Sequence, residues 1–114
     1  MNLPRAARLR RRRDFLKVQQ RGTRLHAGDV VVIALPVGEP RPRIGITVSS
    51  KVGNAVVRNR VKRWVREAFR AERTAWPPVD VVVIARPKAP GLGAAGVRRA
   101  LAEARTRLEE RTRS

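Results

Sequence analysis

The chain of 114 residues is long enough for one domain with a hydrophobic core, and 42% of its residues are hydrophobic. Twenty-seven Lys and Arg residues stand against nine Asp and Glu residues, which gives a formal net charge of +18. So much charge of one sign repels itself in a compact protein and predicts a polyanionic partner. Nucleic acid is the first candidate and an anionic membrane surface is the second. Arginine supplies 23 of the 27 cations, which suits RNA phosphates, although a GC-rich genome would also favour arginine codons.

The chain has no cysteine, which excludes disulfide bonds and thiolate metal sites. Its longest apolar runs have the length of a strand and are too short to cross a bilayer. No apolar signal segment follows the basic N-terminus, MNLPRAARLRRRR. These features together predict a cytoplasmic protein without a membrane partner.

The first part of the chain predicts a short helix behind a basic arm. Residues 1–13 are rich in arginine, and we expect residues 1–8 to be flexible. Asp14 is a suitable N-cap for a helix over residues 15–21, which Gly22 would end. The apolar residues of this helix are three apart and share one face.

Two strands are predicted next, over residues 29–37 and 43–50, because both segments are rich in β-branched residues. The segment GEPRP between them, residues 38–42, predicts a turn and therefore an antiparallel hairpin. In the second strand, isoleucine and valine alternate with small or polar residues. One face of that strand should therefore be apolar, and the other should be open to a ligand or to solvent.

The second half of the chain predicts a helix, a strand and a last helix. Asn54 is a good N-cap for a helix that runs to about residue 73. Residues 79–86 are almost all apolar, which predicts a central strand. A flexible connection over residues 87–95 leads to the last helix, over residues 96–111.

The elements together predict one domain over residues 1–114, with a frayed C-terminus at residues 112–114. Their order is helix, strands, helix, strand, helix (αβββαβα). The expected class is therefore α+β, a sandwich in which helices pack on a small mixed sheet.

The helix predicted after Asn54 is amphipathic, with one apolar stripe and a broad basic face. The apolar stripe consists of Val57, Val61, Trp64, Val65 and Ala68. A ladder of like charge at i,i+4 spacing consists of Arg58, Lys62, Arg66 and Arg70. Each like-charge pair weakens an isolated helix by roughly 0.2–0.5 kcal/mol, and only Glu67, four residues after Arg63, offers relief. Such a ladder predicts a partner with phosphates, although many charge runs are merely solvated helix faces.

Asn59 lies between two arginines of this helix, where it is a poor helix former. Its side chain can offer both a donor and an acceptor to a base edge or to a 2′-hydroxyl group. A neutral, solvent-exposed role is equally compatible with the sequence.

The segment from Lys51 to Arg63, KVGNAVVRNRVKR, resembles the signature of the bacterial ribonuclease P protein subunit, whose core is an Arg-Asn-Arg triplet. The resemblance covers about residues 8–105. Further matches in spacing and order are the first helix with Asp14, Phe15, Val18 and Gly22, the strand residues 44–49, and residues 82–86.

This resemblance implies that the protein binds a large catalytic RNA, and that the holoenzyme removes the 5′ leader from precursor tRNA. It implies that the RNA holds the Mg²⁺ ions and performs the hydrolysis, so the protein would supply no catalytic residue and no metal site. The catalytic RNA and precursor tRNA are the expected partners, and no obligate protein partner is expected. The resemblance also implies a left-handed βαβ crossover through the basic helix.

The resemblance also implies two sets of binding residues. The residues expected to bind the catalytic RNA are Lys51, Asn54, Arg58, Asn59, Arg60, Lys62, Arg63, Arg66 and Arg70. A cleft between the first helix and the sheet would take the single-stranded leader. The residues expected to line it are Arg11, Arg12, Phe15, Lys17, Gln19, Val31, Ile33, Thr47 and Ser49, with Arg86 and Lys88 at its edge.

Two positions depart from the family's pattern. Gln19 stands where a second aromatic residue is common, and no aromatic residue lies near Ile33, where one is frequent. Stacking on leader bases, worth about 1–3 kcal/mol per base, would then depend largely on Phe15. Leader binding would depend more on arginine charge.

The sequence offers no evident catalytic group. A metal nuclease needs clustered carboxylates, and among the nine acids only Glu109 and Glu110 are adjacent. His26 is the only histidine, and no nucleophile-elbow motif supports a triad of His26, Ser49 and Asp29.

Two other functions remain open at the level of sequence. A structural RNA-binding protein, like those of the ribosome, would share the charge and the fold class without a role in cleavage. A DNA-binding protein is the weaker alternative, because no helix-turn precedes the basic helix.

Overall fold

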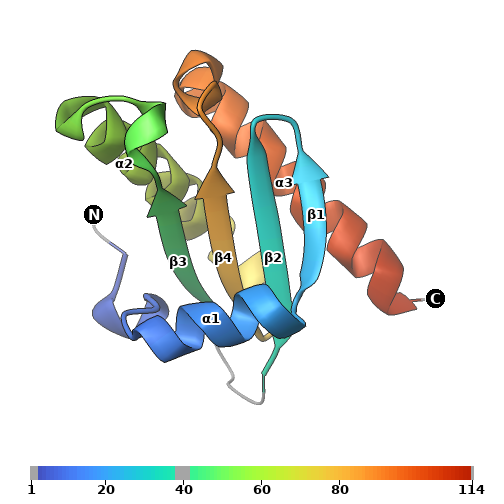
Figure 1. The fold of residues 1–114 in the computed structure, drawn as a ribbon. Coiled ribbons are helices and arrows are strands. Elements are labelled where there is room, and N and C mark those ends of the chain that lie inside the picture. Colours follow the sequence, from blue (N-terminus) through green and yellow to red (C-terminus); the bar gives the residue numbers. More distant parts are fainter. Residues whose placement is uncertain (1–2, 38–41, 114) are drawn as a thin grey trace.

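The computed structural model describes residues 3–37 and 42–113, and the surroundings of side chains up to residue 111. Within these residues, helices lie on both faces of a four-stranded sheet (Figure 1). None of the described helices has the length and apolar character needed to cross a membrane.

The three long helices are α1 (Arg12–Arg21), α2 (Ala55–Ala71) and α3 (Gly93–Arg113). In Figure 1, α1 crosses the front of the sheet near one end of the strands, and α2 and α3 lie behind the sheet. The front face is therefore only partly covered, whereas the back face is covered by two helices that pack against each other.

The sheet contains β1 (Thr23–Ala27), β2 (Val30–Pro36), β3 (Arg43–Val48) and β4 (Val79–Ala85) in the order β1-β2-β4-β3. β2 pairs antiparallel with both β1 and β4, and β4 pairs parallel with β3. This mixed sheet confirms the predicted α+β class and the central position of β4.

The predicted hairpin between the second and third strands is wrong, because β4 lies between β2 and β3. The turn predicted over residues 38–42 lies almost wholly outside the described residues. The hairpin partner of β2 is instead β1, joined through Gly28 and Asp29. Gly28 has a φ of 62°, which glycine adopts readily at the first central position of a two-residue turn.

The connection from β3 through α2 to β4 is a left-handed crossover. In Figure 1 both strands run upward, β4 lies to the right of β3, and α2 passes behind the sheet. About 98% of such connections are right-handed, so this topology is unusual. It places α2 beside β3, at the edge of the sheet.

The core lies between the back of the sheet and the helices α2 and α3. Val61, Val65 and Phe69 of α2 are fully buried there, and the Phe69 ring centroid lies 5.8 Å from that of Trp76. The predicted apolar stripe of the basic helix is therefore confirmed. The N-cap is confirmed too, since Oδ1 of Asn54 accepts a hydrogen bond of 3.0 Å from the backbone N–H of Val57.

The segment before α1 packs on the sheet. Leu3, Ala7 and Leu9 are buried, and the backbone N–H of Leu9 donates a 2.8 Å hydrogen bond to the carbonyl of Ile44 in β3. The flexible arm expected over residues 1–8 therefore lies, from Leu3 onward, against the edge of β3, because its leucines find apolar surface there.

The start of α1 and the end of α2 differ from the prediction. α1 begins at Arg12, so Asp14 lies in its first turn and is not its N-cap. α2 ends at Ala71 rather than near residue 73, and the short helix η3 (Arg73–Ala75) follows it.

The segment 87–95, expected as a flexible connection, contains the short helix η4 (Ala89–Leu92) and the start of α3 at Gly93. Ala89 of η4 is fully buried in the core. At its other end α3 continues to Arg113, beyond the predicted end at residue 111.

Candidate nucleic-acid interface

The basic face of α2 is the first candidate surface. It is formed by Arg58, Arg60, Lys62, Arg63, Arg66 and Arg70, on the side of the helix turned away from the core. Arg58 and Lys62 are half-buried, and the other four side chains are exposed. The amphipathic character predicted for this helix therefore places a band of cations in solvent.

No ion pair neutralises this band within the described part of the chain. The three ion pairs formed there join Arg43 to Asp80, and Arg105 to Glu72 and Glu109. Glu67 forms none with Arg63, although the i,i+4 spacing would allow one. The like-charge repulsion along the ladder is therefore not reduced by an ion pair with Glu67. The charge of this face remains available to a polyanion.

The other residues predicted on this surface are placed around the start of the helix. Lys51 is exposed in the short helix η2 (Ser50–Val52), just before α2. Asn54 is exposed, but its Oδ1 already caps the helix. Asn59 is exposed within the band of cations, as expected. Val56, on the first turn of α2, exposes 66% of its surface and adds an apolar contact point that the sequence did not single out.

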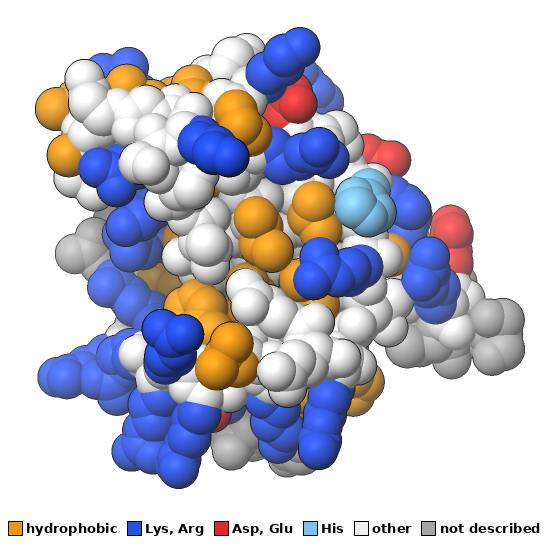
Figure 2. Space-filling view, in the orientation of Figure 1, with side chains coloured by type: hydrophobic (Ala, Val, Ile, Leu, Met, Phe, Trp, Pro, Cys, Tyr) orange, Lys and Arg blue, Asp and Glu red, His pale blue; other side chains and the backbone are white. Residues whose placement is uncertain are grey.

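The uncovered part of the front face of the sheet is the second candidate surface. The register aligns His26 with Val31, Val31 with Ile84, and Ile84 with Thr47, so these four residues form one row across all four strands. We call this row the open sheet face. Figure 2 shows the single histidine of the chain and a group of hydrophobic side chains on this side of the molecule, with Lys and Arg side chains around them.

Phe15 marks the boundary between the open sheet face and the part covered by α1. Its ring lies on Gly45 of β3, and it packs with the apolar cluster that contains Val18, Ile33 and Val82. The phenylalanine is half-buried, so part of its ring remains accessible. Phe15 thus lies between the first helix and the sheet, as the family resemblance implied.

Four of the predicted cleft residues are exposed at one end of the sheet, whereas Ile33 is buried. Thr47 and Ser49 are exposed at the end of β3, and Arg86 and Lys88 are exposed just after β4, at the same end of the parallel pair. Ile33 does not line the surface: it is fully buried beneath α1, because its row of the sheet is the one that this helix covers.

Val31 belongs to the open row, but it exposes only 6% of its surface. Its half-buried neighbour Ile84 therefore presents more apolar surface there.

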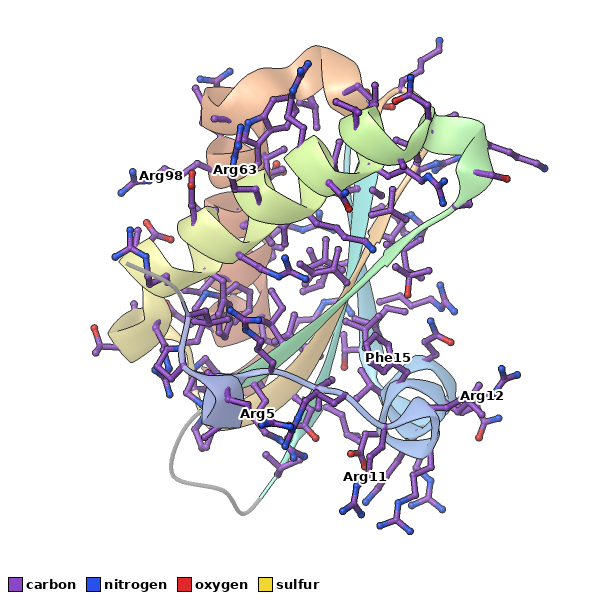
Figure 3. All side chains as sticks on the ribbon, turned by 90° about the vertical axis from the view of Figure 1, so that its left-hand side faces the viewer. Arg5, Arg11, Arg12, Phe15, Arg63 and Arg98 are labelled. Carbon is purple, nitrogen blue, oxygen red and sulfur yellow. The ribbon has the colours of Figure 1, made fainter. Side chains whose placement is uncertain are left out.

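The other predicted residues of α1 differ in exposure. Lys17 is exposed and Gln19 is half-buried on the helix. Figure 3 shows Arg11 and Arg12 pointing away from the sheet at the start of α1. The structure therefore does not bring these two arginines to the open sheet face.

Two residues of the open sheet face were not predicted, His26 and Ile84. His26 lies on β1, which is only five residues long and has just two buried apolar residues, Leu25 and Ala27. The pair Gly28-Asp29 is a hairpin signal that could have identified this strand and aligned His26 with Val31.

The carboxylates and the histidine are scattered. Across the described residues no group of three or more His, Cys, Asp or Glu side chains could hold a metal ion. Within the described residues no such cluster is therefore available to hold a Mg²⁺ ion without ligands from another molecule.

The fold and these two surfaces define a small α+β protein with a basic helix in a left-handed crossover, beside a partly uncovered sheet. Residues 3–109 match the profile of the family described as Ribonuclease P. The ribonuclease P protein component of Desulfovibrio desulfuricans is 47% identical over 87 residues, which are 74% of this chain and 67% of that protein. That of Geobacter sp. (strain M21) is 36% identical over 110 residues, or 96% of this chain and 95% of that protein.

A solved structure gives the same result for the fold. The RNase P protein from Thermotoga maritima has a TM-score of 0.79 and 39% sequence identity, and the match covers 88% of this chain and 96% of that chain. The chain belongs to the ribonuclease P protein family. Its membership implies a subunit of an endoribonuclease, a role in tRNA processing and an RNA subunit as partner.

Proposed function

We propose that this protein binds the catalytic RNA of a ribonuclease P holoenzyme through the basic face of α2. It binds the 5′ leader of precursor tRNA on the open sheet face, and it thereby assists removal of the leader. The observation that carries the proposal is the band of cations on α2, which no acid neutralises by an ion pair within the described residues. Phosphates of a folded RNA would neutralise it and release counterions.

The open sheet face suits a single strand rather than a duplex. Its row of His26, Val31, Ile84 and Thr47 offers both apolar surface and polar groups, and the half-buried ring of Phe15 adjoins it. Unpaired bases are recognised by such combinations of apolar or aromatic contacts and hydrogen bonds. Arg86 and Lys88 at the end of β4 can follow the phosphates of the strand.

The chemistry is assigned to the RNA. The family resemblance supports this assignment, and so does the scattered set of acids, which offers Mg²⁺ no cluster of ligands in the described chain. The protein then contributes binding energy and charge neutralisation, and the complex acts in the cytoplasm.

The test is the affinity of the holoenzyme for precursor tRNA with a leader and for mature tRNA without one. We expect the protein to increase affinity for the precursor more than affinity for the mature tRNA. Equal increases for both would instead support the alternative, a structural RNA-binding protein without a role at the leader.

A further inference from the structure

A hollow of about 470 Å³ opens at the free edge of β3, between the segment before α1 and the helix α2. We call it the edge pocket. Its apolar floor includes Phe15, Gly45 and Ile46. Five cations line it: Arg5, Arg8 and Arg10 from the N-terminal segment, and Lys62 and Arg66 from α2. In Figure 3, which looks at this edge of the sheet, Arg5 and Phe15 both lie below α2.

The cations of the edge pocket come from two segments more than fifty residues apart in the sequence, and no acid is among the described residues that line it. Bringing like charges together opposes folding unless an anion is bound. Arg8 gives a more local sign of a missing partner. Its Nε is buried and has no hydrogen-bond partner within the described part of the protein. A phosphate oxygen would accept that hydrogen bond.

The floor of the edge pocket offers backbone groups as well. At the outer edge of β3, the carbonyl of Ile44 accepts a hydrogen bond from the backbone N–H of Leu9. Backbone groups of alternate strand residues point to the same side, so the N–H and C=O of Ile46 also point outward. Among the described residues only Arg8 forms a bridge with this edge, at Ile44. The pocket therefore presents a donor and an acceptor side by side, which complements the edge of a nucleobase.

A protein strand is a poorer occupant than a nucleotide. β3 ends at Val48, so only Ile46 and Val48 remain for pairing beyond Ile44. Two residues are too few for a stable added strand. The five cations and the ring of Phe15 favour a ligand with both a phosphate and a base.

We propose that the edge pocket binds one unpaired nucleotide of RNA. Its base lies against Phe15 and the backbone of Ile46, and its phosphate lies between the N-terminal arginines and the cations of α2. The proposal rests on the proposed function only in taking RNA as the source. That nucleotide belongs either to the catalytic RNA or to the leader of the precursor.

The first experiment titrates the full-length, ¹⁵N-labelled protein with adenosine 5′-monophosphate, inorganic phosphate or adenosine, and follows the backbone amides by NMR. The nucleotide should shift the amides of Leu9 and Ile46 in a saturable manner. Phosphate alone should bind more weakly and leave the Ile46 amide in place, and adenosine alone should bind weakly. Equal binding of phosphate and nucleotide, with no shift at Ile46, would overturn the proposal.

A variant pair separates the edge pocket from general charge. Arg5 is exposed, so Arg5→Ala should fold normally, and it should weaken nucleotide binding about tenfold through loss of one charge-assisted contact. Arg98→Ala removes the same charge from α3, outside the edge pocket, and should change binding little. Equal losses in the two variants would show nonspecific attraction and overturn the proposal.

The same variants identify the source of the nucleotide. A selective loss of affinity of Arg5→Ala for the catalytic RNA assigns the nucleotide to that RNA. A selective loss for precursor relative to mature tRNA assigns it to the leader. No loss in either measurement would overturn the proposal. The proposed function would not be affected by that outcome, because its leader test is made with the unaltered protein.

Discussion

The ring of Phe15 lies directly on Gly45, where an added Cβ would come within 2.5 Å of the ring atoms Cε1 and Cζ. The missing side chain of Gly45 is therefore what allows α1 to lie close to β3. The Phe15 ring occupies the space that a side chain at Gly45 would fill, and it therefore lies at the boundary of the open sheet face. This contact lies between the open sheet face and the edge pocket, since both residues also line that pocket.

Gly45→Ala should displace Phe15 and reduce the preference of the holoenzyme for precursor over mature tRNA. Overpacking should also lower the free energy of unfolding by about 1–3 kcal/mol. Affinity ratios and urea denaturation measure the two effects. Gly91→Ala is the matched control, because a Cβ at Gly91 has no heavy atom within 4 Å. An unchanged affinity ratio in Gly45→Ala would show that the position of Phe15 does not matter for the leader.

Phe15→Ala should weaken binding of precursor tRNA more than binding of mature tRNA, because only the precursor carries a leader. The loss should be about 1–3 kcal/mol if one base stacks on the ring. Leu16→Ala is the control, since the neighbouring Leu16 is 39% exposed and is not part of the cluster under α1. Equal losses for both tRNAs in Phe15→Ala would remove Phe15 from the leader site.

The double variant Arg58→Ala and Arg60→Ala should weaken binding of the catalytic RNA and flatten its salt dependence. Each lost phosphate contact should reduce the slope of log K against log[salt] by about 0.7–0.9. Arg98→Ala with Arg99→Ala removes two exposed arginines from α3 and keeps the basic face of α2 intact. The same slope for both double variants would show that α2 has no special role in the RNA contact.

The ion pair beneath the start of α1 predicts an asymmetry in stability. Nε and Nη2 of Arg43 donate hydrogen bonds of 2.8 and 2.7 Å to the two carboxylate oxygens of Asp80. The Asp80 side chain is 7% exposed and that of Arg43 is 30% exposed. Removing the arginine leaves the buried carboxylate of Asp80 without its partner, so Arg43→Leu should destabilise the protein more than Asp80→Asn. Asp80→Asn should lower the free energy of unfolding by about 1–3 kcal/mol. Urea denaturation measures both values, and the reverse order would contradict this account.

Elements whose signals lie within their own segment of the chain could be predicted from the sequence. The N-cap at Asn54 and the stripe ending in Ala68 define α2 within a few residues, since both features lie within the helix itself. The central position of β4 follows from its apolar character on both faces. The basic face of α2 follows from the same periodicity as the stripe.

Features that depend on partners distant in the sequence could not be predicted from the local pattern, and only the family resemblance implied the βαβ crossover that joins β3 to β4. The pairing of β3 with β4 rather than β2 is decided by packing across the whole sheet, and an antiparallel hairpin satisfies the local pattern equally well. The burial of Ile33 depends on where α1 crosses the sheet. The edge pocket depends on Leu3 and Leu9 docking the N-terminal segment, and the high charge of that segment conceals this packing.

The central claim is that the protein binds and the RNA cleaves, and single-turnover cleavage of precursor tRNA at low Mg²⁺ tests it most directly. We predict rapid cleavage by the catalytic RNA with the protein, slow cleavage by the RNA alone, and none by the protein alone. Equal rates with and without the protein, or cleavage by the protein in the absence of the RNA, would contradict the account.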